Sequence, residues 1–507
     1  MLATIYSAAT LGVDGYLVDV EVDVAKGGMF QFLIVGLPDA SVKESTSRVE
    51  VALQSQGFRV PRTRVLVNLA PADVRKEGPA FDLPIALGLL AGSDQLRSPQ
   101  LGSYLVTGEL SLEGTLRPVS GVLPMALAAR QAGKRGIVLP KENAREAAVV
   151  HGLAVYPVGS IREAVAVLED APEPLPAEDL SAHLSDPAWE IDFSEVRGQE
   201  HVKRALEVAA AGGHNVLMQG PPGSGKTMLA RRLATILPPL GFEEALEVTK
   251  LYSITGLLGR ERALVTQRPF RAPHHTVSDA GLIGGGSIPR PGEISLAHHG
   301  VLFLDELPEF SRQALEVLRQ PLEEGHVTIA RAAAAVTYPA RCVFVGAMNP
   351  CPCGYLGDPV RPCSCPEQSV RRYRARISGP LLDRIDLHIE VPRLKQEELL
   401  SPGASEPSRT IRARICRARE IQQRRFHGTR VFANAAMQPR QVKTFCKVQP
   451  DGEALLKSAI ERLGLSARAY DRILKLARTI ADLAGADAIG VPHLAEAIQY
   501  RSFDRQF

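Results

Sequence analysis

The chain has 507 residues, a formal net charge of +3 and a hydrophobic fraction of 45%. One hydrophobic core does not extend over such a length, so we expect two to four domains. No apolar run reaches about 18 residues, and the first residues lack the basic and apolar regions of a signal peptide. These features exclude a membrane-spanning or secreted class, and we expect a cytoplasmic protein without a membrane partner.

The first part of the chain mixes strand and helix patterns. Apolar and polar side chains alternate from Tyr16 to Val22, which predicts a half-buried strand. Leu123 to Gln131 instead has the pattern of a helix. We therefore expect a mixed α/β domain over residues 1–170.

Two segments rich in proline and small residues predict the domain boundaries. Residues 171–190 cannot sustain a helix or a central strand and are interpreted as a linker. A weaker boundary lies at Ser401 to Ser408. These boundaries predict a central domain over residues 191–400 and a C-terminal domain over residues 401–507.

Part of the N-terminal domain resembles the proteolytic domain of Lon, which has a ribosomal S5 domain 2-like fold. The resemblance lies in Thr107 to Gly114 and Pro118 to Gly121. Lon cuts peptides with a Ser/Lys dyad, but Ala80 stands at the serine position here, and Val122 to Pro124 stand near the lysine position. Without a nucleophile and its base, covalent catalysis has no starting point. The resemblance therefore implies a Lon-like domain that binds or assembles and has no peptidase activity.

The most specific motif lies between a short apolar run and a helix-like segment. It has the eight residues of a phosphate-binding loop: Gly220, Pro221, Pro222, Gly223, Ser224, Gly225, Lys226 and Thr227. The glycines leave the backbone free to wrap a triphosphate, whose charge meets N–H groups at a helix N-terminus. Lys226 is expected to reach the β- and γ-phosphates of ATP, and Thr227 to bind Mg²⁺.

A second acidic motif supplies the other half of a nucleotide site. The apolar run Val301 to Leu304 is followed by Asp305 and Glu306. We expect Asp305 to hold Mg²⁺ and Glu306 to polarise the attacking water. Alone, such a run is more often a plain strand that leads into a loop, but the phosphate-binding loop favours the functional interpretation.

Four of the seven cysteines are crowded into one Gly/Pro-rich loop. They are Cys351, Cys353, Cys363 and Cys365. Four thiolates within tetrahedral reach suit a structural zinc. The spacing inside each pair is tighter than the usual two to four intervening residues, so free thiols remain the alternative.

Arginines follow the cysteine loop and recur in the C-terminal domain. One group is Arg371, Arg372, Arg374 and Arg376. The stretch 409–430 is also rich in arginine and has one acid, Glu420. A solvated helix face is the common outcome for such a charge run, and contact with DNA phosphates is the functional hypothesis. No motif that reads bases is present, so DNA binding should depend on structure more than on sequence.

The last hundred residues have apolar side chains at helical spacing and no strand-like alternation. The clearest examples are Ile473, Leu476, Ala477, Ile480 and Leu483. We therefore expect a helical C-terminal domain.

The central domain resembles an AAA+ ATPase with an insert after the helix of the phosphate-binding loop. The insert contains Phe270 to His275 and Gly284 to Ser287. By this resemblance Asn349 is the polar sensor that orients water, Arg384 is a finger presented to a neighbouring subunit, and Arg468 is the second sensor on a helical lid. A finger supplied in trans implies a ring, and the family resemblance implies a homo-hexamer.

Nearly the whole chain is similar to the ComM (YifB) family of magnesium-chelatase-like AAA+ proteins. The resemblance includes Tyr338 to Cys365, Ser378 to Asp386 and Tyr500 to Ser502. It implies a hexameric, ATP-dependent DNA translocase or helicase that acts on single-stranded, duplex or branched DNA and promotes branch migration in recombination and natural transformation. The alternatives are the ATPase motor subunit of a metal chelatase and an AAA+ protein-remodelling factor.

Overall fold

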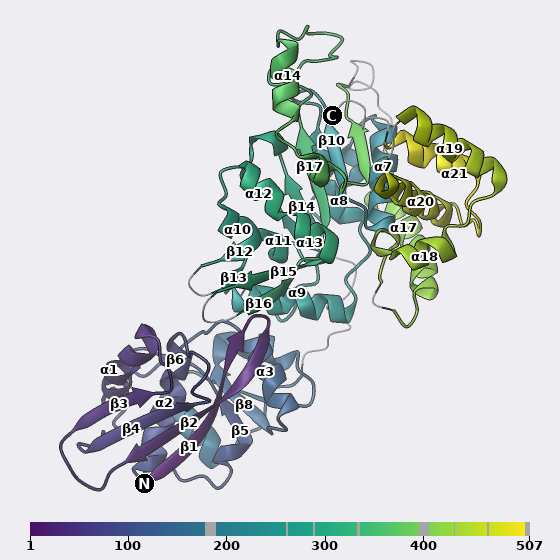
Figure 1. The fold of residues 1–507 in the computed structure, drawn as a ribbon. Coiled ribbons are helices and arrows are strands. Elements are labelled where there is room, and N and C mark those ends of the chain that lie inside the picture. Colours follow the sequence, from purple (N-terminus) through teal and green to yellow (C-terminus); the bar gives the residue numbers. More distant parts are fainter. Residues whose placement is uncertain are drawn as a thin grey trace. The chain divides into compact units, whose positions relative to one another are not determined.

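A computed structural model describes residues 1–177, 189–259, 262–286, 289–331, 335–394, 405–429, 431–463 and 466–501. It divides into two compact units (Figure 1). The N-terminal unit contains Met1–Ser185 and Gly241–Thr266, and the P-loop unit contains Asp186–Leu240 and Gln267–Phe507. Most of the predicted linker, residues 401–404 of the weaker boundary, Ser287 and Ser502 lie outside the described residues.

The N-terminal unit is built on a seven-stranded sheet with the order β3-β4-β2-β1-β5-β8-β9. These strands are β1 (Leu2–Leu11), β2 (Asp14–Val24), β3 (Gln31–Val35), β4 (Arg64–Ala70), β5 (Tyr104–Val106), β8 (Gly136–Pro140) and β9 (Ala154–Val158). β2 pairs antiparallel with β1 and β4, whereas β1, β5, β8 and β9 pair in parallel. The alternation predicted around Tyr16 to Val22 is confirmed in β2, where Val18, Val20 and Val22 are buried.

Six α-helices belong to the described part of this unit. They are α1 (Ala40–Ser55), α2 (Asp82–Gly92), α3 (Val122–Gln131), α4 (Ala144–Ala148), α5 (Ile161–Glu169) and α9 (Phe242–Ile254). A short antiparallel pair, β6 (Glu109–Leu110) and β7 (Leu116–Arg117), is also present. α3 matches the predicted helix. α9 follows the phosphate-binding loop in sequence, yet the Gly121 N–H donates to the Ser253 carbonyl at 3.0 Å.

The P-loop unit has a five-stranded parallel sheet with the order β11-β14-β17-β10-β18. Its strands are β10 (Val216–Gln219), β11 (Phe270–Arg271), β14 (Val301–Leu304), β17 (Val343–Met348) and β18 (Leu387–Glu390). Every residue of β10, β14 and β17 is buried, which explains why these strands are continuous apolar runs. In a parallel sheet all strands end at the same edge, where ligands bind.

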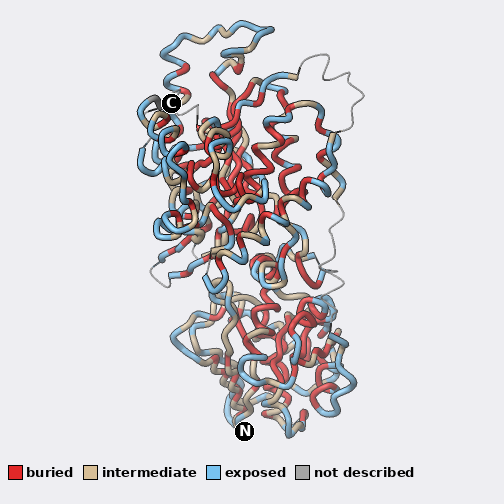
Figure 2. Tube along the Cα trace, turned by 90° about the vertical axis from the view of Figure 1, so that its right-hand side faces the viewer, coloured by how far each residue is buried: buried red, intermediate tan, exposed pale blue. Residues whose placement is uncertain are grey.

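The remaining elements of this unit surround the sheet or extend from it. The helices are α7 (Glu200–Gly212), α8 (Lys226–Ile236), α10 (Asp279–Ile283), α11 (Glu293–Leu296), α12 (Arg312–Val317), α13 (Arg319–Glu324), α14 (Glu367–Arg374) and α15 (Gly379–Leu382). Two hairpins are formed by β12 (Gly284–Gly285) with β13 (Arg290–Pro291) and by β15 (His326–Ala330) with β16 (Ala335–Pro339). Figure 2 shows the buried residues concentrated inside each unit.

The C-terminal part of the P-loop unit is helical, as predicted. Its helices are α17 (Ser408–Arg425), α18 (Pro439–Phe445), α19 (Pro450–Leu463), α20 (Ala467–Leu483) and α21 (Val491–Gln499). The predicted apolar stripe lies on α20, where Ile473, Leu476, Ala477 and Ile480 are buried and Leu483 is partly buried against the same core. No described helix of the chain is both long and apolar enough to cross a membrane.

Candidate functional site

The phosphate-binding loop connects β10 to α8, and its shape requires glycine. Gly223 and Gly225 have φ angles of 75° and 90°, in the left-handed region that favours glycine. A Cβ atom on Gly220 would lie 2.1 Å from the Val391 carbonyl oxygen. The Ser224 hydroxyl is buried and makes no hydrogen bond within the described residues. An unpaired donor and a left-handed, glycine-rich backbone fit a loop that binds phosphate oxygens.

Lys226 brings together two of the predicted site segments. Its Nζ donates to the Gly220 carbonyl at 2.7 Å, to the Pro221 carbonyl at 2.9 Å and to Asn349 Oδ1 at 3.3 Å. Asn349 follows the end of β17, so the predicted polar sensor lies beside the loop lysine. Burial lowers the pKa of Lys226, although the nearby carboxylates of Asp305 and Glu306 partly oppose this shift.

Thr227 and Asp305 form the candidate Mg²⁺ site. The Thr227 hydroxyl donates to Asp305 Oδ2 at 2.7 Å, and the Glu306 N–H donates to Asp305 Oδ1 at 2.9 Å. Asp305 follows β14, which is separated from β10 only by β17. A hydroxyl oxygen and a carboxylate at one point are the hard ligands that Mg²⁺ takes in phosphate-binding sites. These two residues therefore fit the ion that the loop motif implies.

Glu306 follows Asp305 in the segment after β14 and has a left-handed conformation, with φ of 51°. Its carboxylate oxygen Oε2 lies 3.5 Å from His275 Nδ1. The sequence pattern did not indicate this histidine. The only available signal was its position shortly after a short strand of the insert.

Neither predicted arginine makes a hydrogen bond or an ion pair with these loop residues in the described parts of the chain. The Arg384 side chain is 11% exposed and donates to the Arg319 carbonyl at 3.1 Å, to the Pro380 carbonyl at 2.7 Å and to Glu323. Arg468 lies exposed in the first turn of α20, which Ser466 caps. Arg384 is therefore held by its own chain, whereas Arg468 faces solvent.

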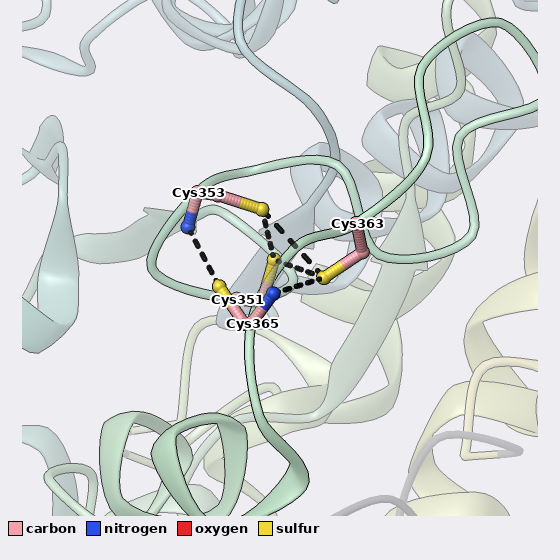
Figure 3. Close-up of side chains that lie close together, drawn as sticks. All are labelled: Cys351, Cys353, Cys363 and Cys365. Carbon is pink, nitrogen blue, oxygen red and sulfur yellow. Dashed lines mark hydrogen bonds between the residues drawn. The ribbon is translucent and has the colours of Figure 1, made fainter.

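The four loop cysteines lie together (Figure 3). The Sγ–Sγ distances are 3.4 Å for Cys351 and Cys353, and 3.6 Å from Cys363 to each of these two. The Cys353 N–H points at Cys365 Sγ from 3.3 Å. Tetrahedral zinc with Zn–S bonds of about 2.3 Å requires Sγ–Sγ distances of about 3.8 Å. Backbone hydrogen bonds from Tyr355 and Ser364 hold the pKa of the Cys353 thiol at about 6, whereas burial and the neighbouring thiols raise the pKa values of Cys363 and Cys365.

Four arginines of α17 make hydrogen bonds or ion pairs with other parts of the chain, and one of them, Arg412, is buried. Arg412 donates to the Thr235 carbonyl at 3.1 Å, and Arg419 to the Ala210 and Phe432 carbonyls at 3.1 Å. Arg414 pairs with Glu207 and Glu406, and Arg425 with Asp482. Exposed positions on this helix are Arg409, Arg417 and Arg424. The pattern of charges could not distinguish arginines that pack against neighbouring helices from those that face solvent.

Family models match most of the chain in three segments. Residues 192–399 match "Magnesium chelatase, subunit ChlI", residues 20–143 match "Subunit ChlI of Mg-chelatase", and residues 405–501 match "Magnesium chelatase, subunit ChlI C-terminal". The first of these contains the phosphate-binding loop, the acidic pair and the cysteine cluster.

Individual relatives extend the match to full length. The chain is 46% identical to the competence protein ComM of Haemophilus influenzae, over 99% of this chain and 98% of that protein. It is 44% identical to the uncharacterized protein YifB of Salmonella typhimurium over the same shares. A local match, 29% identical over 101 residues, links 20% of the chain to 18% of Lon protease 2 of Bacillus subtilis. The chain therefore belongs to the ComM (YifB) family of magnesium-chelatase-like AAA+ proteins.

Proposed function

We propose that the protein is an ATP-dependent DNA translocase or helicase that promotes branch migration of joint DNA molecules in recombination and natural transformation. One observation carries the ATP-dependent part. Lys226 and Thr227 of one glycine-rich loop meet Asn349 and Asp305, which come from two other segments. The full-length similarity to a competence protein supports the DNA-directed part.

The loop residues have distinct roles in the proposed hydrolysis of ATP. Backbone N–H groups of the loop and Lys226 Nζ would hold the β- and γ-phosphates in place of the carbonyl partners of Lys226. Thr227 and Asp305 would hold Mg²⁺, which supplies charge neutralisation at the phosphates. Glu306 would accept the proton of the attacking water, and Asn349 Oδ1 would orient that water.

Ring assembly would complete the site. Phosphoryl transfer depends mainly on positioning and charge neutralisation, and an arginine supplied in trans is worth roughly 10³- to 10⁵-fold in rate. We assign this role to Arg384 of a neighbouring copy in a hexamer, and assign Arg468 to nucleotide contact from α20. The intrachain contact of Arg384 with Glu323 would have to break or rearrange when a neighbour binds.

The cysteine cluster is proposed to hold one structural zinc. The support is the Sγ spacing together with the backbone N–H groups of Cys353 and Cys365, which point at sulfur. Cys351 directly follows Asn349 and Pro350, so zinc would stabilise the segment that carries the polar sensor. If the four cysteines were free thiols, which is the alternative, nothing would require their sulfur atoms to lie within 4.8 Å of one another.

The N-terminal unit is proposed to be a Lon-like module without peptidase activity. Ala80 is buried, and its carbonyl accepts from the Gly108 N–H at 3.0 Å. An alanine methyl group offers no nucleophile, so the backbone of a serine motif can persist here without its chemistry. We assign the unit a binding or assembly role.

Two other functions have specific support. The family models name magnesium chelatase, which favours an ATPase motor subunit of a metal chelatase. The Lon match favours a protein-remodelling factor. Neither accounts for the full-length match to a competence protein.

The deciding experiment is displacement of labelled strands from three- and four-strand DNA junctions in the presence of ATP, with Glu306→Gln as the inactive control. Wild-type protein should displace the strands and the variant should only bind them. Failure of the wild type to bind or resolve junctions, combined with stimulation of its ATPase by a porphyrin chelatase partner or by unfolded polypeptide, would replace this proposal with one of the other two.

A further inference from the structure

The segment that carries Arg384 is held by contacts with other elements of the P-loop unit. The Asn215 side-chain amide donates to the Arg384 carbonyl at 3.0 Å, and the Arg501 guanidinium donates to the Ile385 carbonyl. Asp386 directly precedes β18, and its Oδ2 accepts the Asn215 N–H at 3.1 Å. The segment from Arg384 to Asp386 is therefore anchored by contacts that do not involve the Arg384 side chain.

Asp386 also joins this segment to helix α20 through an ion pair. Arg472 Nη1 lies 2.9 Å from Asp386 Oδ1, and the two side chains are 18% and 9% exposed. Opposite charges attract more strongly in such a poorly hydrated place than at the protein surface. Arg468, the predicted second sensor, lies about one helical turn before Arg472 on the same helix. The ion pair therefore ties the segment of Arg384 to the helix that carries Arg468.

The protonation states at Asp386 make Arg472 its charged partner. Burial alone would raise the pKa of Asp386, but the charge of Arg472 and the hydrogen bond from His214 outweigh burial and lower this pKa. His214 Nδ1 lies 3.4 Å from Asp386 Oδ2, and its Nε2 lies 2.8 Å from the Thr479 hydroxyl of α20. Burial lowers the pKa of His214, so its imidazole is neutral near pH 7. In the described residues, Asp386 is therefore a carboxylate that pairs with the positive charge of Arg472.

This anchor matters most when the Arg384 side chain leaves its own chain. Here that side chain is held by the Arg319 and Pro380 carbonyls and by Glu323. Contact with the nucleotide of a neighbour would break these bonds, and the position of the guanidinium would then depend on the anchored segment. Displacement of a catalytic group by about 1 Å costs about 10²-fold in rate. A firm anchor on α20 would therefore set how well the finger works.

We propose that Arg472 is a positioning residue for the finger, because its ion pair with Asp386 fixes the segment that carries Arg384. This inference rests on the proposed role of Arg384 in trans. Arg472 makes no hydrogen bond or ion pair with the phosphate-binding loop, Asp305 or Glu306 in the described residues. Its loss should therefore slow hydrolysis in the neighbouring subunit without weakening nucleotide binding.

The first measurement is ATP hydrolysis by Arg472→Ala. Its kcat should fall by about 10- to 100-fold, because the finger is displaced but still present. Arg384→Ala, which removes the finger, should lose roughly 10³-fold or more. The affinity of Arg472→Ala for a fluorescent ATP analogue should match that of the wild type.

Arg204→Ala is the matched control. Arg204 Nε lies 2.9 Å from Glu496 Oε1, the same separation as in the Arg472 pair, and this ion pair joins α7 to α21. Arg204 makes no hydrogen bond or ion pair with the segment of Arg384 in the described parts of the chain. The control variant should hydrolyse ATP at the wild-type rate.

Mixed rings show in which subunit the defect lies. Arg472→Ala protein keeps an intact loop beside a displaced finger, whereas Lys226→Ala protein keeps an intact finger. Their mixture should recover part of the activity, because the loop of one can meet the finger of the other. A mixture of Arg472→Ala and Arg384→Ala proteins should not recover, because neither supplies a working finger. A defect in the nucleotide site of the Arg472→Ala subunit itself would give the reverse pattern.

A wild-type kcat in Arg472→Ala, or any other recovery pattern, would overturn the positioning role. Loss of one partner of a buried ion pair is strongly destabilising, so assembly is checked by gel filtration. If Arg472→Ala does not assemble like the wild type, Arg472→Gln takes its place in the same mixtures, because glutamine keeps a side-chain N–H for Asp386. The same recovery pattern is expected for it, and the same outcomes would overturn the role.

The mixture of Arg384→Ala and Lys226→Ala proteins separates this inference from the proposed function. If that mixture does not recover, Arg384 does not act in trans, and the proposed finger fails together with this inference. If that mixture recovers while the Arg472→Ala mixtures depart from the expected pattern, only the positioning role of Arg472 fails.

Discussion

Lys226 and Glu306 make different contacts near the phosphate-binding loop. From these contacts we expect one residue to act in ATP binding and the other in ATP hydrolysis. Lys226 is 8% exposed and its ammonium group makes three hydrogen bonds within the loop and to Asn349. Glu306 is far more exposed. Its N–H donates to Asp305 Oδ1, whereas the Thr227 hydroxyl donates to Asp305 Oδ2. We therefore expect Lys226 to hold phosphate and Glu306 to act on water.

Lys226→Ala should therefore abolish ATP binding, whereas Glu306→Gln should bind ATP with near wild-type affinity and lower kcat by about 10²- to 10⁴-fold. Titration with a fluorescent nucleotide and a phosphate-release assay measure the two effects separately. Equal nucleotide affinity in the wild type and Lys226→Ala would contradict the role assigned to the lysine.

At the scale of elements, the cysteine loop packs directly on the phosphate-binding loop. Gly354 has φ of 85°, and a Cβ atom there would lie 2.6 Å from the Pro222 ring. Gly354 follows Cys353 directly, so a change in the position of the cysteine cluster would shift Gly354 and, through it, Pro222. A metal that holds the cluster would therefore also restrict the phosphate-binding loop.

Cys353→Ser should lose the metal and raise KM for ATP, because metal binding free energy is also folding free energy for such a loop. Elemental analysis of protein purified without chelator should give about one zinc per chain for the wild type and much less for the variant. Cys416→Ser is the matched control, since Cys416 lies on α17, away from the cluster, and should keep both metal and KM. Full activity of zinc-free protein would leave the four cysteines without a metal-binding role.

Helix α17 contains arginines that pair with acidic residues and arginines that are exposed to solvent. We expect different effects when each kind is replaced. Arg425 is 12% exposed and its Nη1 atom donates to Asp482 at 2.7 Å, while Asp482 also pairs with Arg478. Arg417 is exposed. Arg425→Ala should lower the free energy of unfolding by about 3 kcal/mol, because it weakens a buried ion-pair network, whereas Arg417→Ala should change it by less than about 0.5 kcal/mol. Denaturant unfolding followed by circular dichroism measures the stability of both variants.

For DNA binding by the folded protein, we expect the exposed arginines to matter more than Arg425. Charge reversal at Arg409 and Arg417 should weaken binding equally for all sequences and reduce its salt dependence, since each neutralised phosphate releases counterion. Unchanged DNA affinity in that double variant would place the DNA contact on other elements.

At the scale of the whole molecule, the proposed activity depends on neighbouring copies. Arg384 contacts Glu323 and backbone carbonyls of its own chain, and does not contact its own Lys226 or Asp305 in the described residues. If Arg384 acts in trans, mixtures of Arg384→Ala and Lys226→Ala proteins should recover part of the ATPase activity. An interface between the loop of an Arg384→Ala subunit and the finger of a Lys226→Ala subunit is intact, whereas a ring of either variant alone contains no intact interface. No recovery at any mixing ratio would count against the finger assignment.

The sequence predicted local features well because their causes are local. A phosphate-binding loop is recognisable from glycines that tolerate positive φ, and buried parallel strands are recognisable as continuous apolar runs. The helical C-terminal part followed from the spacing of Ile473, Leu476 and Ala477. The domain boundaries were harder to infer, because α9 follows the loop helix in sequence yet belongs to the N-terminal unit.

The sequence by itself determined the family, the residues of the loop and acidic pair, and the grouping of four cysteines, since each depends on residue type and short-range spacing. Only the tertiary structure decided which charged groups are neighbours. It placed His275 beside Glu306, Glu323 beside Arg384, and Gly354 against Pro222. It also showed that Arg412 and Arg425 of α17 face the interior. Such contacts join residues from separate elements, and their partners are set by the packing of those elements, which no local pattern records.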